Sequence, residues 1–383
     1  MKKKYLDLIS WSIFLFFLIF TILLVYQSLY EPTIPEAKDF IAFWSAAKLS
    51  ALGRPEDAYN IAKMAEVVGS ASSIEQGFSW LYPPTFQAIA LPLSLLTYPT
   101  AFILFSTCTF LMMLIALIYF SRRELLLPII TAPTLFIAVT FGQNSMLTAA
   151  LGITAITLIQ KKPVFSGICI GILSIKPHLF VLLPLFAIIE KQWKTLGYAI
   201  ATTIFLLLLS IILLGPSPWC SFFENVPMAP TWLQNGVLPT DLMTSIAANM
   251  LNFGFKIKSA IIIHTLNLII VSISTITAFK LTKNINLRGA AIIVLTLNLS
   301  PYMYTYELTW LTAALALLLI ERSWKRNHKI IMIGCWIFPL IDFIQNIIYE
   351  KSFSLTFLIS YLLLYIIIQR AREERLQLTH NLG

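Results

Sequence analysis

Long apolar runs recur along the whole chain and decide what it can fold into. Runs of roughly 16–22 residues extend from the N-terminal to the C-terminal region, and each can cross, or nearly cross, a ~30 Å hydrocarbon core as a helix. Only helices satisfy their own backbone within lipid. With 58% hydrophobic and 12% charged residues, the chain is predicted to be an all-α polytopic membrane bundle in a lipid bilayer, with about 12 transmembrane helices and one integral domain over residues 1–383.

The basic residues predict the orientation of this bundle. The formal net charge is +9, but the positive residues form short clusters at helix ends, as positive-inside bias produces, and do not indicate a nucleic-acid partner. The first apolar run follows MKKK and has no small-residue cleavage site after it, so it is interpreted as an uncleaved helix with a cytoplasmic start. The clusters at 280–288, 322–329 and 370–375 lie on the same side under this orientation, so both termini are predicted to be cytoplasmic.

The path between the two large polar loops has two solutions. If every run crosses and 164–190 is one kinked helix, the basic pairs at 122–123 and 161–162 lie outside. If 84–97 only dips into the membrane and 164–190 is two half-length spans broken at Lys176 and Pro177, both pairs lie inside and Lys176 faces out. The charge rule favours the second solution.

Two polar stretches are predicted to be extracytoplasmic loops, residues 29–84 and 215–257. In the first, Thr33 and Glu36 have capping-box spacing, which predicts a helix that ends near Leu52. A second helix is predicted from Pro55 to about residue 69. The first helix carries an apolar stripe that is typical of an amphipathic helix on a membrane surface; its members are Phe40, Phe43, Trp44, Ala47 and Ala51.

The order of six segments resembles glycosyltransferase family 87. They are DFIAFWSAAKL, GRPEDAY, LYPPTFQAIALPLSLL, FGQNSML, GICIGILSIKPHLFVLLPLF and NLSPYMYTYEL, within about residues 35–310. Members are GT-C-type membrane enzymes that use polyprenyl-phosphate sugars, typically mannose, on the extracytoplasmic face. The resemblance implies a GT-C bundle in the plasma (inner) membrane that transfers a hexose, by inverting single displacement, to a glycan or glycolipid. It implies no cofactor and leaves a divalent metal open.

The resemblance also implies one catalytic residue and two residues that bind the donor phosphate. An aspartate in the first external loop acts as general base in this family, and Asp39 is the matching position; alternatively, Asp39 only stabilises the start of its helix. Lys176 lies within an apolar run, where a charge costs about 3 kcal/mol or more and normally faces a cavity or a partner. With His178 it would hold the lipid phosphate, although it could instead snorkel to an interface.

Five further polar residues are candidate substrate contacts. Gln143 and Asn144 could bind sugar hydroxyls or hydrogen-bond neighbouring helices. Tyr82 is either an interfacial anchor or a substrate contact. Tyr306 and Glu307 are predicted at the external end of a span, within reach of a cleft. No metal site can be argued from residue spacing.

A transporter or flippase for lipid-linked glycans is the alternative function. Such a protein would also use about a dozen helices and a basic cavity. The long external loop with its acidic residue, and the lack of an evident inverted repeat, favour the enzyme.

Overall fold

The described part of the molecule is a bundle of helices. The computed structural model describes residues 39–71, 80–120, 126–235, 238–321, 324–348 and 353–380, with scattered positions between 8 and 23. These residues form helices and turns with one isolated antiparallel bridge, between Met243 and Tyr304. The prediction of an all-α fold is therefore confirmed, whereas most of the first apolar run and residues 29–38 lie outside the described part.

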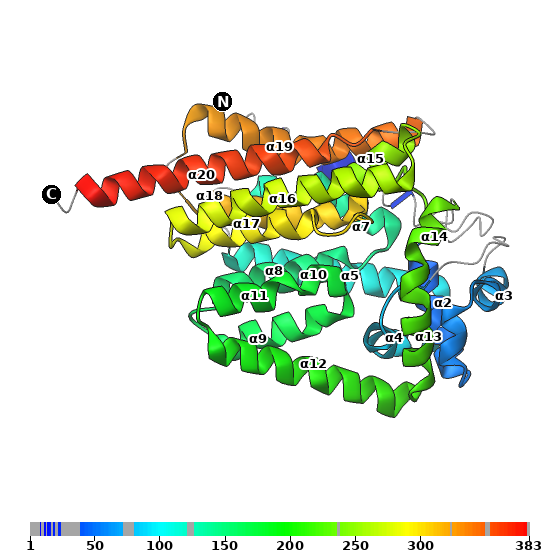
Figure 1. Ribbon diagram of the computed structural model, residues 1–383. Coiled ribbons are helices and arrows are strands. Elements are labelled where there is room, and N and C mark those ends of the chain that lie inside the picture. Colours follow the sequence, from blue (N-terminus) through cyan, green and yellow to red (C-terminus); the bar gives the residue numbers. More distant parts are fainter. Residues whose placement is uncertain are drawn as a thin grey trace.

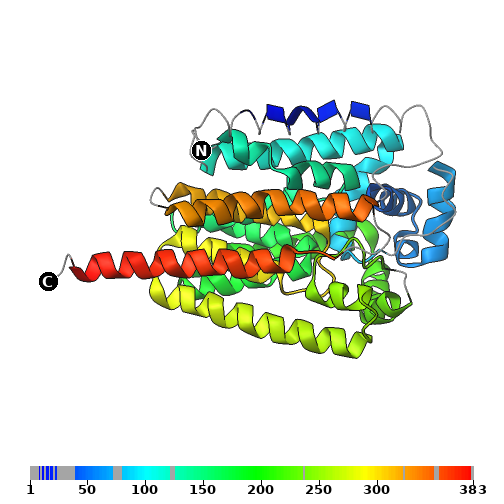
Figure 2. The same cartoon turned by 90° about the horizontal axis from the view of Figure 1, so that it is seen from above.

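Long helices run along a common axis and form the frame of the bundle (Figure 1). They are α5 (Tyr98–Phe120), α12 (Trp193–Leu214), α16 (Ile257–Leu281), α19 (Arg326–Ile348) and α20 (Thr356–His380). Among the described residues, four helices are long and apolar enough to cross a membrane: α5, α12, α16 and the first part of α19. Helix α20 continues past the end of the bundle at the C-terminus (Figure 2).

Shorter apolar helices pack inside this frame. They are α6 (Leu126–Ile130), α7 (Pro133–Phe141), α8 (Ser145–Leu158), α9 (Pro163–Ile172) with η4 (Leu173–Ile175), α10 (Pro177–Phe180), α11 (Leu182–Ile189), α17 (Ile285–Leu297) and α18 (Thr309–Ile320). At 1.5 Å per residue, a helix of 14 residues such as α8 is roughly 21 Å long. This is shorter than a hydrocarbon core of ~30 Å, so a total of about twelve spanning helices stays a prediction.

The structure agrees with the second of the two paths predicted for the chain between the polar loops. Residues after Pro83 form only α4 (Pro84–Ala90) and η2 (Leu91–Leu95), which stay beside α2. Helix α9 then runs in one direction, and α10 and α11 return in the other, with Lys176 at the tip (Figure 1). The segment 164–190 is therefore a hairpin of two half-length arms.

The two ends of the bundle differ in character. One end, here called the basic end, carries the exposed Lys161, Lys162 and Lys191 at the turns next to α9 and α11. The opposite end, here called the loop end, carries Lys176 and is covered by helices outside the frame (Figure 1). The covering elements are α2 (Phe40–Ala51), η1 (Pro55–Tyr59), α3 (Ile61–Ala71), α13 (Ser217–Asn225), η5 (Val226–Met228), α14 (Ala229–Gln234) and α15 (Ile246–Asn252).

Glycines allow the hairpin to lie close to α12. A Cβ added at Gly167 would lie 2.5 Å from the carbonyl oxygen of Thr195, and one at Gly171 would lie 2.8 Å from that of Ala199. The two glycines are four residues apart, the small-xxx-small spacing that lets membrane helices approach closely. This contact fixes the arm of the hairpin that ends at Lys176.

Helix α2 differs from the amphipathic surface helix expected of the first loop. Phe40, Phe43, Trp44 and Ala47 are all at least nine-tenths buried within the protein, where they pack on η2, α4 and the start of α5. The apolar stripe thus faces protein, and Ala51 alone of its members is exposed. The segment from Pro55 begins as a 3-10 turn, and the second α-helix starts at Ile61.

Candidate active site

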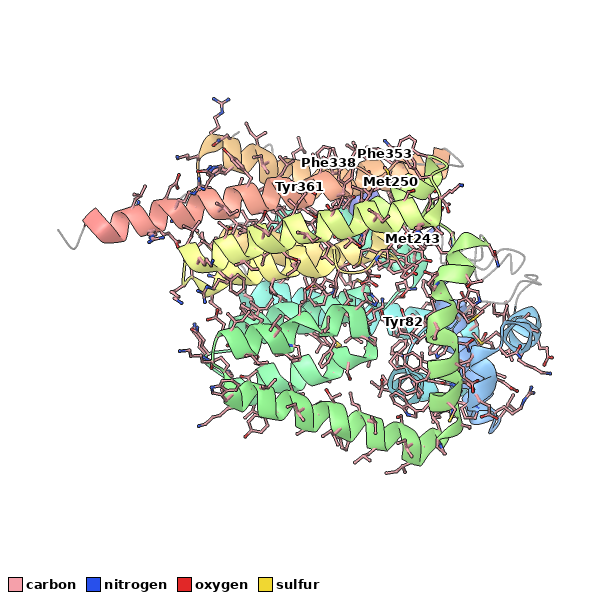
Figure 3. All side chains as sticks on the ribbon, viewed as in Figure 1. Tyr82, Met243, Met250, Phe338, Phe353 and Tyr361 are labelled. Carbon is pink, nitrogen blue, oxygen red and sulfur yellow. The ribbon has the colours of Figure 1, made fainter. Side chains whose placement is uncertain are left out.

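The predicted site residues come together at the loop end, where the short helices stop. Tyr82 lies there between the end of α10 and α13 (Figure 3). The arm of the hairpin below Lys176 has 10 residues in α9 and 3 in η4, which corresponds to roughly 20 Å. The arm alone is therefore shorter than a ~30 Å hydrocarbon core.

Asp39 is held by a chain of hydrogen bonds. Nε2 of Gln143 donates to Oδ2 of Asp39 at 2.8 Å, and the Tyr82 hydroxyl donates to Oε1 of Gln143 at 2.9 Å. The Tyr82 hydroxyl also lies 3.5 Å from Oδ1 of Asn144. Because Tyr82 donates to the amide oxygen, the amide nitrogen must face Asp39, so the chain fixes how the carboxylate is oriented.

Asp39 does not act as the cap of its own helix. It occupies the N-cap position of α2, but its side chain makes no capping hydrogen bond there. Its carboxylate instead accepts from Gln143, which is 104 residues away in the sequence. Asp39 therefore does not stabilise the start of α2 through a capping hydrogen bond. Its role as general base stays a prediction.

Lys176 and Glu307 form a buried ion pair. Nζ of Lys176 donates to Oε1 of Glu307, and the two side chains are 5% and 3% exposed. The ammonium also lies over two aromatic rings, 5.4 Å from the centroid of Tyr82 and 5.4 Å from that of Tyr306. Carboxylate and rings together stabilise a charge that would be costly alone in an apolar bundle.

Aromatic rings form the walls around these polar groups. Tyr304 and Tyr306 are stacked with centroids 5.2 Å apart, and Phe43 packs edge-on against Tyr82 at 5.3 Å. Burial raises the pKa of the Tyr82 phenol well above its usual value, and the charges of Glu307 and Asp39 raise it further. The Tyr82 hydroxyl therefore stays protonated and remains a hydrogen-bond donor.

Local sequence signals explain how each segment presents its side chains. Gly142, with φ +64°, ends α7 in the left-handed conformation that glycine readily adopts, and the chain turns there to present Gln143 and Asn144. Pro177 begins α10, so the helix of the first arm stops and leaves Lys176 between the arms. The 3-10 turn η6 (Thr305–Leu308) presents Tyr306 and Glu307.

One predicted site residue stands apart from the others. His178 is half-buried in α10, close enough to Lys176 for the lysine charge to act on its imidazole. The other seven predicted positions are joined by the contacts described above. No group of three His, Cys, Asp or Glu side chains that could hold a metal ion occurs among the residues for which the structure gives positions.

Two features of the site were not predicted from the sequence. The first is Tyr304, whose ring stacks on Tyr306 and whose pKa is raised by burial and by the charge of Asp39. The alternation of tyrosines at 302, 304 and 306 was the available signal. The second is the pairing of Lys176 with Glu307, which the rule that intramembrane charges need partners could have suggested.

Comparison with known protein families gives one match. The family model described as "Glycosyltransferase family 87" matches residues 80–301, more than half of the chain. The matched range contains Tyr82, Gln143, Asn144, Lys176 and His178. Asp39 and the turn η6 lie outside it. Neither the search of curated proteins nor the search of solved structures found a match.

Proposed function

The chain belongs to glycosyltransferase family 87, and from this premise we propose which sugar transfer it performs. The donor is a polyprenyl-phosphate sugar, and the sugar is a hexose, with mannose favoured. The acceptor is a glycan or glycolipid outside the cytoplasm. The observation that supports this proposal best is the connected group of polar residues at the loop end, namely Asp39, Gln143, Tyr82, Lys176 and Glu307.

Asp39 is the general base in this proposal. Its carboxylate takes the proton of an acceptor hydroxyl while that oxygen forms a bond to the anomeric carbon of the donor. The bond between the anomeric carbon and the phosphate oxygen breaks, its electron pair leaves with the polyprenyl phosphate, and the configuration inverts. A positioned base contributes roughly 10²–10⁴-fold to such a step, and the hydrogen bond from Gln143 supplies the positioning.

Lys176 and His178 are proposed to hold the donor phosphate. The phosphate of a polyprenyl lipid stays near the membrane surface because its chain occupies the hydrocarbon core. Lys176 lies at the tip of the hairpin, at the end of the bundle that the loop elements cover. An ammonium there can donate to a phosphate oxygen, and the charge would stabilise the leaving group as it departs.

The distribution of charge supports a site outside the cytoplasm. The basic end carries Lys161, Lys162 and Lys191, and positive-inside bias places such an end in the cytoplasm. The loop end, with the described parts of 39–84 and 215–257, then lies outside the plasma (inner) membrane, and the C-terminus is cytoplasmic. A donor carried by a lipid suits this side, because nucleotide-activated sugars are cytoplasmic.

Transfer by purified protein in nanodiscs tests the proposal. The donor is radiolabelled polyprenyl-phosphate mannose, the acceptor is a membrane-glycan extract, and wild type is compared with Asp39→Asn. The exposed Glu66 lies in the same loop and pairs with Lys63, so Glu66→Gln is the matched control.

We expect labelled product from wild type and from Glu66→Gln, and almost none from folded Asp39→Asn. Equal turnover by Asp39→Asn would remove Asp39 from the mechanism. If wild type forms no product but moves the labelled lipid across a vesicle membrane, the flippase alternative is correct instead.

A further inference from the structure

Two buried polar groups in the site have no hydrogen-bond partner within the protein. They are Oε2 of Glu307 and Nδ2 of Asn144. Glu307 is 2% exposed and Asn144 is 0% exposed, so bulk solvent does not satisfy them. Leaving a buried carboxylate oxygen or amide nitrogen unpaired is costly, and native proteins rarely do so without a ligand, an ion or an ordered water at that place.

The two groups belong to neighbouring segments of the site. Oγ of Ser145, the residue after Asn144, lies 3.2 Å from Oγ1 of Thr309, which follows the turn that carries Glu307. Tyr82 also connects them: its hydroxyl is 3.5 Å from Oδ1 of Asn144, and its ring faces the ammonium of Lys176, the partner of Glu307. The unpaired donor, Nδ2 of Asn144, and the unpaired acceptor, Oε2 of Glu307, thus belong to two side chains that Tyr82 connects.

We infer that Asn144 and Glu307 form a subsite for two hydroxyl groups of the transferred sugar. Nδ2 of Asn144 can only donate, and an ionised Oε2 of Glu307 can only accept. A sugar hydroxyl does both, so one hydroxyl can accept from Asn144 while another donates to Glu307. An ionised phosphate oxygen can only accept, so it could pair with Nδ2 of Asn144 but not with Oε2 of Glu307. This inference rests on the proposed function.

The ion pair gives Lys176 a second role in this subsite. Because the ammonium binds Oε1 of Glu307, it fixes the carboxylate and leaves Oε2 for the ligand. A hydroxyl that donates to a charged group makes a stronger bond than one that pairs with a neutral amide. Glu307 is therefore expected to contribute more to sugar recognition than Asn144.

The test measures binding of three kinds of lipid to the full-length protein in nanodiscs. The probes are polyprenyl phosphate without sugar, polyprenyl-phosphate mannose, and versions of the latter that each lack one hydroxyl. The variants are Asn144→Leu and Glu307→Gln. The control is Asn267→Leu, which makes the same chemical change at a buried asparagine that bonds Asn298 and Tyr361 in the bundle.

We expect wild type to bind the mannosyl lipid more tightly than the bare phosphate lipid. Removing one particular hydroxyl should weaken binding roughly three- to tenfold, and removing a second roughly ten- to hundredfold. Asn144→Leu should bind the mannosyl lipid more weakly and become insensitive to loss of the first hydroxyl, while its affinity for polyprenyl phosphate is unchanged. Glu307→Gln should lose most of its sensitivity to loss of the second, because a neutral amide bonds a hydroxyl more weakly than a carboxylate does. Asn267→Leu should bind every lipid as wild type does.

Two results separate the subsite from the function on which it rests. If wild type binds the mannosyl lipid but tolerates the loss of every hydroxyl, or if Asn144→Leu and Glu307→Gln keep the full wild-type sensitivity, the subsite is refuted and the proposed function stands. This would be the result if the unpaired groups only hold an internal water. If wild type binds none of the lipids, the proposed function fails, and the subsite fails with it.

Discussion

Replacing only one residue of the Lys176–Glu307 pair should destabilise the protein much more than replacing both residues. Both side chains are at least 95% buried. Removing one partner of such a pair typically costs about 3–5 kcal/mol because the other charge is left uncompensated. Lys176→Met leaves the carboxylate of Glu307 among aromatic rings, so we expect a loss near the upper value.

Glu307→Gln should cost less than Lys176→Met. The ammonium keeps its contacts with the faces of Tyr82 and Tyr306, each worth about 0.5–2 kcal/mol, and the new amide oxygen can still accept from it. We therefore expect a loss of about 3 kcal/mol. The double variant removes both charges, so it should lose only about 1–2 kcal/mol, mainly the cation–π contacts.

A double-mutant cycle measures this difference directly. Unfolding of each variant is followed in mixed micelles as denaturing detergent is added, and the coupling energy is the double loss minus the two single losses. The losses above correspond to a coupling of about 6 kcal/mol in magnitude. The exposed pair Lys63 and Glu66, 3.0 Å apart with side chains 43% and 56% exposed, is the control and should couple by no more than about 0.5 kcal/mol. Losses at Lys176 and Glu307 that add within about 0.5 kcal/mol would refute the account of a mutually dependent buried pair.

Three further substitutions test other contacts. Gln143→Leu should lower kcat about tenfold or more with Asp39 still present, since it removes the bond that orients the base; unchanged steady-state kinetics would show that this bond does not matter. Gly171→Leu should destabilise the bundle by about 1–3 kcal/mol or more, because its side chain would overlap Thr202 of α12, and a wild-type melting temperature would contradict the close packing. Asp342→Asn should lower the free energy of unfolding by about 1–3 kcal/mol, because the carboxylate accepts from two side chains and one backbone N–H at the start of α20. Thermal unfolding measures this loss, and a variant as stable as wild type would contradict the importance of these hydrogen bonds.

Local signals in the sequence were sufficient to predict the hairpin and the break at which Lys176 lies. A lysine followed by proline in an apolar run predicts both a helix break and a charge that needs a partner. The basic pair at 161–162 favoured the half-length arms over one long helix, and the structure has these arms. Gly142 before Gln143 and Asn144 likewise indicates a turn between two short helices.

Other features could not be predicted because they depend on contacts between distant segments. The period of the stripe on α2 identifies an apolar face but not whether lipid or protein covers it. Here aromatic rings from Trp80, Phe86 and Phe102 cover it. Lys176 and Glu307 are 131 residues apart, and no local pattern encodes their pairing. The same holds for Gln143 and Asp39.

The half-length hairpin has a consequence for how the enzyme senses its lipid surroundings. Asp39 precedes α2, one of the elements that cover the loop end. Lys176 follows an arm that starts at the basic end and has 10 residues in α9 and 3 in η4. In the proposed mechanism, the base and the phosphate-binding lysine are thus attached to opposite ends of the bundle. Helices adapt to bilayers of different thickness by tilting, at a modest energetic cost, and such tilting changes the height of the hairpin tip relative to the opposite surface. We therefore expect the rate of sugar transfer to depend on the acyl-chain length of the lipids. The rate should be highest at the bilayer thickness that brings Asp39 and Lys176 to matching heights.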